Sequence, residues 1–161
     1  MGNIISFKDD SICISNGATD VFINLIALSG SELAKTDSEK RLIVWISEKD
    51  QNTIGMGTVG FDISEMIWNR KTFLNDRAFL VKVIENAETG FCWEKLDYKP
   101  NKEIILPVLK KFKEMLLSMT ENDIKDEELR EWLKETPKCD FSRCKKHNTL
   151  LTFCGCQVCN N

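Results

Sequence analysis

The most constraining feature of this chain is the concentration of metal-binding residue types near its C-terminal end. Five of its seven cysteines and its only histidine lie within residues 139–161. This segment contains a C-x-x-H pair, Cys144 and His147, and a C-x-x-C pair, Cys156 and Cys159, with eight residues between them. A two-residue spacing lets one tight turn direct two ligands at the same ion. Two such turns joined by a short hairpin can form a tetrahedral cage, so the segment predicts a metal site.

The donor types in this cage favour zinc. Thiolate and imidazole ligands together suit zinc, and four protein ligands usually make a closed structural site. We therefore predict one structural zinc ion per chain, with the ligands Cys144, His147, Cys156 and Cys159. Cys139 and Cys154 are alternates that could replace a member of this set. An iron–sulfur cluster fits so compact an arrangement less well. A redox-active C-x-x-C would need a strand before it and a helix after it, so a redox disulfide is also a weaker interpretation.

The spacing of the tail resembles that of zinc ribbons and zinc knuckles, which are small metal-binding modules. The resemblance covers about 20 residues and concerns only the ligand spacing. It implies a hairpin fastened by a metal ion, and it implies no particular activity.

The rest of the chain is predicted to fold as a mainly α-helical body with a small N-terminal β-hairpin. A length of 161 residues corresponds to one domain with at most a small appendage. We place the body at residues 1–136 and the zinc-binding tail at residues 137–161, because Pro137 ends the last predicted helix.

The predicted hairpin spans residues 4–15, where apolar and polar residues alternate. With a two-residue turn at residues 9–10, the apolar side chains of both strands share one face of the hairpin. The predicted facing pairs are Phe7 with Ile12 and Ile5 with Ile14. A lone hairpin is marginally stable, so this face should pack against helices.

Apolar residues at helical spacing predict most of the remaining body to be helical. The expected helices span about 19–33, 37–49, 66–68, 73–87, 106–119 and 121–135. Thr19 and Thr36 are the expected N-caps of the first two helices, and Glu39 completes a capping box with Thr36. Gly30 is expected to weaken or end the first helix. Pro107 is expected in the first turn of its helix.

Other segments are predicted to be irregular or extended. Residues 50–62 are expected to form a glycine-bearing loop, and residues 89–101 are expected to hold a short strand. Cys13 and Cys92 have apolar neighbours in the sequence, so we expect both to be buried as small apolar side chains.

Three further sequence signals are interpreted structurally. The G-x-G-x-x-G pattern at residues 55–60 does not lie between a predicted strand and a predicted helix, so we interpret it as a flexible loop and not as a nucleotide site. Gly2 fits an N-myristoylation pattern, but one acyl chain binds membranes weakly and no polybasic patch follows. The acidic residues at 123–131 are interpreted as a solvated helix face.

Charge and hydropathy exclude other classes of protein. The net charge is −3 and the sequence pI is about 5.3, which disfavours a generally basic nucleic-acid-binding protein. The tail from residue 137 has four basic residues against one acidic residue, so it is locally basic. No apolar run approaches the roughly 18 residues that a transmembrane helix needs. The N-terminal segment lacks the features of a signal peptide, so a cytoplasmic location is expected without membrane association.

These features favour a non-enzymatic, zinc-stabilised protein that binds another protein as an adaptor, regulator or inhibitor. The only histidine is a predicted metal ligand, which removes the usual base for a serine or cysteine nucleophile. Trp68, Trp93 and Tyr98 are candidate contacts with a protein partner, because aromatic residues are enriched at binding hot spots. One alternative is nucleic-acid binding through the basic tail. Another is a small zinc metalloenzyme, which would need an open coordination position.

Overall fold

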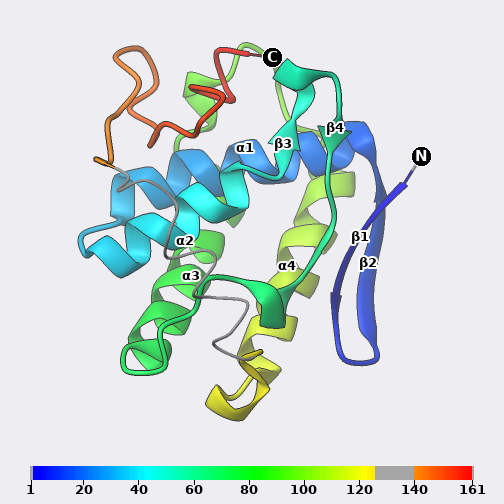
Figure 1. Ribbon diagram of the computed structural model, residues 1–161. Coiled ribbons are helices and arrows are strands. Elements are labelled where there is room, and N and C mark those ends of the chain that lie inside the picture. Colours follow the sequence, from blue (N-terminus) through cyan, green and yellow to red (C-terminus); the bar gives the residue numbers. More distant parts are fainter. Residues whose placement is uncertain (1, 126–139, 161) are drawn as a thin grey trace.

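The computed structural model describes residues 2–125 and 140–160, and this part of the chain is mainly α-helical with a small sheet (Figure 1). Its α-helices are α1 (Asn16–Leu33), α2 (Asp37–Ser47), α3 (Phe73–Glu88) and α4 (Lys102–Ser118). α1 runs across the molecule and packs against the other three helices. In Figure 1, α3 and α4 lie on one side of α1, and the C-terminal segment lies on the other side. α1 is therefore the element that joins the body to the candidate metal site.

The strands form two small sheets. β1 (Gly2–Phe7) pairs with β2 (Asp10–Ser15) in an antiparallel hairpin and with β5 (Phe61–Asp62) in parallel, so the strand order is β2-β1-β5. β3 (Asp50–Gln51) and β4 (Gly57–Thr58) form the second, antiparallel pair. β2 lies against α1 and α4, as the marginal stability of a lone hairpin requires.

The N-terminal hairpin is confirmed, but its predicted register is wrong by two residues. The turn lies at Lys8–Asp9, where Lys8 has a φ of 53°, and Ile5 pairs with Ile12. Side chains alternate with a period of two, so a shift of two residues leaves the same side chains on the inner face. Ile5 and Ile12 are accordingly buried, as is Phe7. The alternation of apolar residues could not distinguish these two registers.

The boundaries of α1 differ from the prediction at both ends. Ser15 is the N-cap, and its hydroxyl accepts the N–H of Ala18 at 3.1 Å, so the helix begins before Thr19. Gly30 does not end the helix, which continues to Leu33. A Cβ atom at Gly30 would collide with the side chain of Ile43, so glycine at this position allows α1 and α2 to pack closely.

The helix predicted at 37–49 is confirmed as α2, whereas the helix predicted at 106–119 is α4 and starts earlier than predicted. Thr36 and Glu39 form the predicted capping box at the start of α2. α4 begins at Lys102, with Asn101 as its N-cap, so Pro107 lies inside the helix and not in its first turn. In α3 the buried face carries Phe79, whereas Leu74 is 67% exposed.

The segments between helices contain short elements in place of the predicted ones. A 3-10 turn occupies Ile63–Glu65, and residues 66–68 are not helical. Another 3-10 turn, Trp93–Lys95, replaces the predicted strand in residues 89–101. The predicted loop at 50–62 contains the short strands β3, β4 and β5. Of the predicted helix 121–135, the structure describes residues 121–125, which contain the 3-10 turn Glu121–Asp123 and no α-helical residue.

The boundary between residues 136 and 137 also lies outside the described residues, so the division into body and tail stays a prediction. What the structure describes is extensive packing between residues 140–160 and the helical body. Leu150 is fully buried and belongs to the main hydrophobic core. A smaller apolar cluster joins the two parts and contains Leu28, Cys92, Cys156 and Val158.

Candidate metal centre

The four predicted ligands lie together in the structure. The ligand atoms of Cys144, His147, Cys156 and Cys159 all lie within 4.8 Å of one another. The Sγ atoms of Cys144 and Cys159 are 3.6 Å apart. His147 Nδ1 lies 3.7, 3.6 and 3.3 Å from the Sγ atoms of Cys144, Cys156 and Cys159, respectively.

These distances match the edges of a small tetrahedron. With Zn–S near 2.3 Å and Zn–N near 2.0–2.1 Å, a regular tetrahedron has S–S edges of about 3.8 Å and S–N edges of about 3.6 Å. The four separations given above lie within about 0.3 Å of these values. The other two, from Cys156 Sγ to the sulfur atoms of Cys144 and Cys159, are at most 4.8 Å. The four side chains could therefore hold one metal ion.

The C-x-x-H pair lies in a tight turn at the end of a short hairpin. Arg143 and Leu150 form an antiparallel bridge, and the N–H of Cys144 donates to the carbonyl of Thr149 at 2.8 Å. Inside the turn, the N–H of Asn148 donates to the carbonyl of Cys144 at 2.9 Å, and Asn148 has a φ of 58°. The N–H of His147 points at Cys144 Sγ, 3.4 Å away. This local backbone geometry directs both side chains to one point.

The C-x-x-C pair lies in a second turn. An antiparallel bridge between Thr152 and Gly155 reverses the chain, and Gly155 has a φ of 88°, which glycine adopts without strain. The N–H of Asn160 then donates to the carbonyl of Cys156 at 3.2 Å, which closes the turn around both cysteines. The hydroxyl of Thr149 lies 3.0 Å from Cys156 Sγ and links the two turns.

The site is buried on one side and open on the other. Cys156 and His147 are each 6% exposed, Cys144 is half-buried and Cys159 is exposed. Desolvation opposes ionisation of Cys144, but hydrogen bonds from the backbone of His147 and Lys146 outweigh it and lower the pKa of this thiol to about 6. Desolvation and the neighbouring sulfur atoms of Cys144 and Cys156 raise the pKa of Cys159 to about 11. A cation between the sulfur atoms would remove this mutual repulsion.

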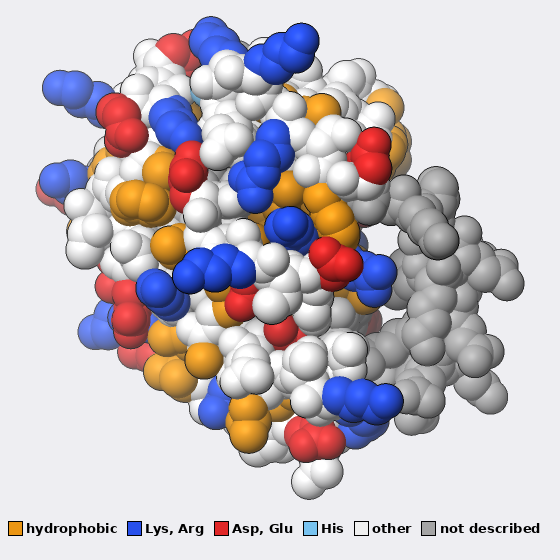
Figure 2. All heavy atoms as spheres, turned by 90° about the vertical axis from the view of Figure 1, so that its left-hand side faces the viewer, with side chains coloured by type: hydrophobic (Ala, Val, Ile, Leu, Met, Phe, Trp, Pro, Cys, Tyr) orange, Lys and Arg blue, Asp and Glu red, His pale blue; other side chains and the backbone are white. Residues whose placement is uncertain are grey.

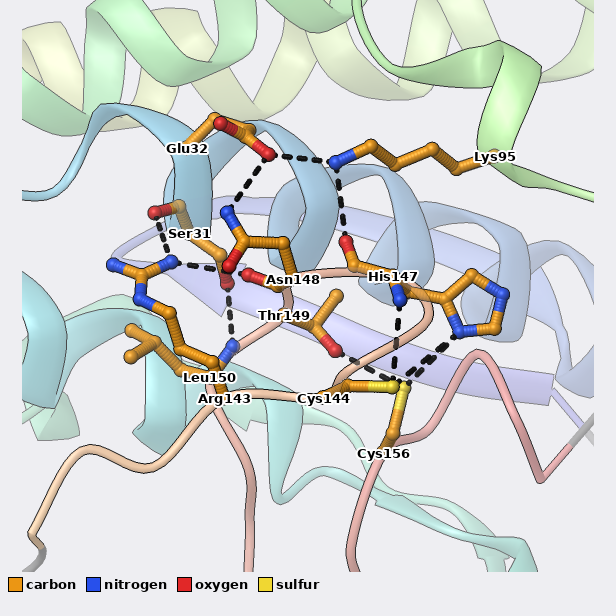
Figure 3. A network of polar contacts seen from close by, with 10 residues as sticks. All are labelled: Ser31, Glu32, Lys95, Arg143, Cys144, His147, Asn148, Thr149, Leu150 and Cys156. Atoms are coloured by element: carbon orange, nitrogen blue, oxygen red, sulfur yellow. Dashed lines mark hydrogen bonds and ion pairs between the residues drawn. The ribbon is translucent and has the colours of Figure 1, made fainter.

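Polar contacts fasten the C-x-x-H turn to the body (Figure 3). Lys95 Nζ lies 2.6 Å from Glu32 Oε1 and donates to the carbonyl of His147 at 3.1 Å. The side-chain amide of Asn148 donates to the same oxygen of Glu32 at 3.1 Å. The hydrogen bonds from Lys95 and Asn148 lower the pKa of Glu32. One carboxylate of α1 therefore binds both the turn and the segment after α3.

The last turn of α1 forms the other half of this interface. Arg143 donates to the carbonyl of Ser31 at 2.7 Å and to the carbonyl of Asn148 at 3.0 Å. The hydroxyl of Ser31 accepts the N–H of Leu150 at 2.9 Å. The last four carbonyls of a helix lack intrahelical partners and carry partial negative charge. Arg143 supplies both a donor and a positive charge at this helix end, where α1 has no basic residue of its own.

The alternate ligands do not join the cluster within the described residues. Cys154 lies outside the group of four, and its N–H donates to the hydroxyl of Thr152 at 3.1 Å. Cys139 lies outside the described part of the chain. Of the two distant cysteines, Cys92 is buried as predicted, but Cys13 is exposed because it alternates onto the outer face of β2.

The candidate partner contacts differ from one another in exposure. Trp68 is 2% exposed and its indole N–H donates to the carbonyl of Ile63 at 2.8 Å, so it is a core residue and offers no surface to a partner. Trp93 and Tyr98 are half-buried. The hydroxyl of Tyr98 accepts the side-chain amide of Asn24 at 3.2 Å, which ties it to α1.

Comparison of the chain with known protein families, curated proteins and solved structures gives no match. None of the helices within the described ranges has the length and apolar character to cross a membrane. The candidate site therefore rests on the geometry of this chain alone. Sequence spacing predicted the four residues that lie together, but it gave no signal for Ser31, Glu32 or Lys95, which contact the turn that carries Cys144 and His147.

Proposed function

We propose that this chain is a non-enzymatic protein in which one zinc ion fastens a knuckle-like C-terminal tail to a helical body. The observation that carries the proposal is the cluster of Cys144, His147, Cys156 and Cys159, whose ligand atoms lie within 4.8 Å of one another. Three sulfur ligands and one imidazole are typical of structural zinc sites. Because thiolates must stay reduced to bind the ion, a reducing compartment such as the cytoplasm suits this site.

The role of the ion is to bring two turns together on the surface of α1. Leu150 lies between the two ligand pairs in the sequence and is fully buried in the body. Arg143 and Asn148 flank the C-x-x-H turn and bind the last turn of α1. A metal ion that fixes both turns thereby fixes the residues that contact the body.

A catalytic role for the ion is disfavoured by the number of ligands. Four protein ligands leave no coordination position for a water molecule or a substrate, so the ion cannot readily act as a Lewis acid. The only histidine of the chain is one of these ligands, which leaves no imidazole to act as a general base.

Nucleic-acid binding through the basic tail is also disfavoured. Arg143 points at two backbone carbonyls and is therefore engaged within the protein. Figure 2 views the side of the molecule that lies at the left in Figure 1, and there lysine and arginine side chains are interspersed with acidic ones. A phosphate backbone is bound best by a continuous basic stripe, which this face does not present.

We propose that the zinc-fastened protein binds another protein through the turn between β3 and β4. Ile54 and Met56 lie in this turn and are 56% and 67% exposed. Exposed apolar residues close together in a surface turn are one feature by which a protein contact site can be recognised. Gly55 and Gly57 flank Met56 with φ values of 77° and 70°, which glycine adopts without strain.

Metal analysis of the intact protein tests the zinc proposal. We expect elemental analysis by mass spectrometry to find about one equivalent of zinc per chain. Cys144→Ser should lower the zinc content strongly, whereas Cys154→Ser, outside the cluster, should leave it unchanged. A folded native protein without bound metal, or equal loss in both variants, would contradict the proposal.

Affinity capture with the zinc-loaded protein tests the partner surface. Ile54→Ser combined with Met56→Ser should remove captured protein, and Leu74→Ser is the matched control because Leu74 is equally exposed but lies on α3. Identical capture by all three proteins would rule out the β3–β4 turn as the contact surface.

A further inference from the structure

The four ligands of the candidate metal centre differ in their accessibility to small oxidants. Cys159 is exposed and Cys144 is half-buried, whereas Cys156 is only 6% exposed. Cys156 also packs against Leu28 and Cys92 in the smaller apolar cluster. A soluble oxidant therefore reaches the sulfur atoms of Cys159 and Cys144 more readily than that of Cys156.

The two accessible sulfur atoms also have a suitable separation. Cys144 Sγ and Cys159 Sγ are 3.6 Å apart, and a disulfide requires about 2.05 Å. The approach of about 1.5 Å involves the exposed side of the site, where side chains can move. Cys156 Sγ is held by the hydroxyl of Thr149 at 3.0 Å on the buried side.

From this asymmetry we infer that Cys144 and Cys159 are an oxidation site, at which a peroxide replaces the metal by a disulfide. This inference rests on the proposed zinc site. Sequence spacing alone would instead predict a disulfide within the C-x-x-C pair, between Cys156 and Cys159.

The reaction balances with hydrogen peroxide as the two-electron oxidant. Cys159 is a thiolate when it serves as a zinc ligand. This thiolate attacks one peroxide oxygen, the O–O bond breaks, and the sulfur becomes a sulfenic acid as hydroxide leaves. The Cys144 thiolate then attacks this sulfur, forms the S–S bond and displaces a second hydroxide. Two protons from solvent convert both hydroxides to water. The zinc ion leaves because two of its four thiolate and imidazole ligands are lost.

The disulfide would keep the tail in place after the metal has gone. It joins the C-x-x-H turn to the C-x-x-C turn, as the ion does. The contacts of Arg143, Asn148 and Leu150 with α1 involve neither sulfur atom, so they persist. The oxidised protein therefore exchanges a metal link for a covalent link between the same two turns.

Peptide mapping of the oxidised, full-length protein tests the inference. Trypsin cleaves after Arg143 and after the lysines that follow Cys144, so Cys144 leaves on a short peptide of its own. Both C-x-x-C cysteines stay together on residues 147–161. A disulfide to Cys144 therefore adds the mass of the short peptide, whereas a C-x-x-C disulfide only removes two hydrogens.

We expect zinc-loaded protein treated with hydrogen peroxide to release about one equivalent of zinc, which is detected with a metal-sensitive dye. The main product should contain a disulfide between Cys144 and Cys159. Fragmentation of the linked peptides in the mass spectrometer identifies which cysteine of residues 147–161 is bonded. Cys154→Ser should give the same product, and Cys159→Ser should give none. A dithiol with added zinc should restore the starting protein.

Other outcomes overturn the inference. These are a main link between Cys156 and Cys159, a link through Cys154, sulfinic or sulfonic acids without a link, or zinc retained in the linked protein. If the isolated protein contains no zinc, the proposed function fails. The same peptide map of the metal-free chain still decides whether Cys144 and Cys159 are the pair that oxidises.

Discussion

Leu150→Ala is the most direct test of whether the tail is part of the folded body. Leu150 lies between the two ligand pairs, yet its side chain is fully buried in the main core. Its N–H donates to the hydroxyl of Ser31, so the backbone is held in place when the side chain is shortened. The substitution should therefore leave a cavity between the tail and α1.

The magnitude follows from the burial of this side chain. Replacing a fully buried leucine by alanine costs about 2–5 kcal/mol, because transfer free energy and packing contacts are both lost. We expect about 3 kcal/mol at this position. For a chain of this size each kcal/mol lowers the melting temperature by roughly 2–4 °C. The expected decrease is therefore about 6–12 °C.

Thermal unfolding of the zinc-loaded protein, followed by circular dichroism of its helices, provides the assay. Phe153→Ala is the matched control, because Phe153 lies in the same tail but is 67% exposed. Its effect should stay within about 0.5 kcal/mol. Zinc content is measured for both variants, so that loss of the ion is distinguished from loss of packing.

Two results would refute this reasoning. One is a melting temperature of Leu150→Ala that equals that of Phe153→Ala. The other is a separate, early transition that alone responds to Leu150→Ala, since this would mean that the tail unfolds independently of the helices.

Two further predictions concern metal removal and pH. A chelator should increase hydrogen exchange in residues 140–160 and leave most of the helical signal, because the helices have their own apolar core; complete loss of helix would contradict this. Burial raises the pKa of Asp76, and hydrogen bonds from Ser38 and Thr72 only partly offset it. The folded state thus holds this proton more tightly than the unfolded chain, so the free energy of unfolding should fall as pH rises from the ordinary aspartate pKa of about 3.9 through the raised one. Asp76→Asn should remove this part of the pH dependence in urea unfolding; an unchanged dependence would show that Asp76 does not titrate as described.

The candidate ligands were predictable because their geometry is local. Cys144 and His147 lie in one turn, and Cys156 and Cys159 lie in another, so two-residue spacing determines each pair. The capping box at Thr36 was predictable for the same reason. Features that depend on a few consecutive residues leave a clear pattern in a single sequence.

Errors arose where local patterns allow more than one arrangement. Alternation in the hairpin is the same for two registers, and the backbone at Lys8 decides between them. Pro107 suggested a helix start, but Asn101 accepts the N–H of Glu103 and begins α4 one turn earlier. Residues such as Ser31 and Lys95 could not be found, because their contacts with the tail connect positions far apart in the sequence.

The end of α1 explains why the tail and the body depend on each other. A helix end with no basic residue leaves its carbonyls without charge compensation, and Arg143 from the tail provides it through the carbonyl of Ser31. Arg143 can do so only if the adjacent turn keeps its position against α1, and Cys144 and His147 in this turn lie close to the second pair of candidate ligands. We therefore expect a bound ion to act on the helical body through the last turn of α1. Removal of the ion should first be detected there, at the amides of Leu150 and of the turn that surrounds Ser31.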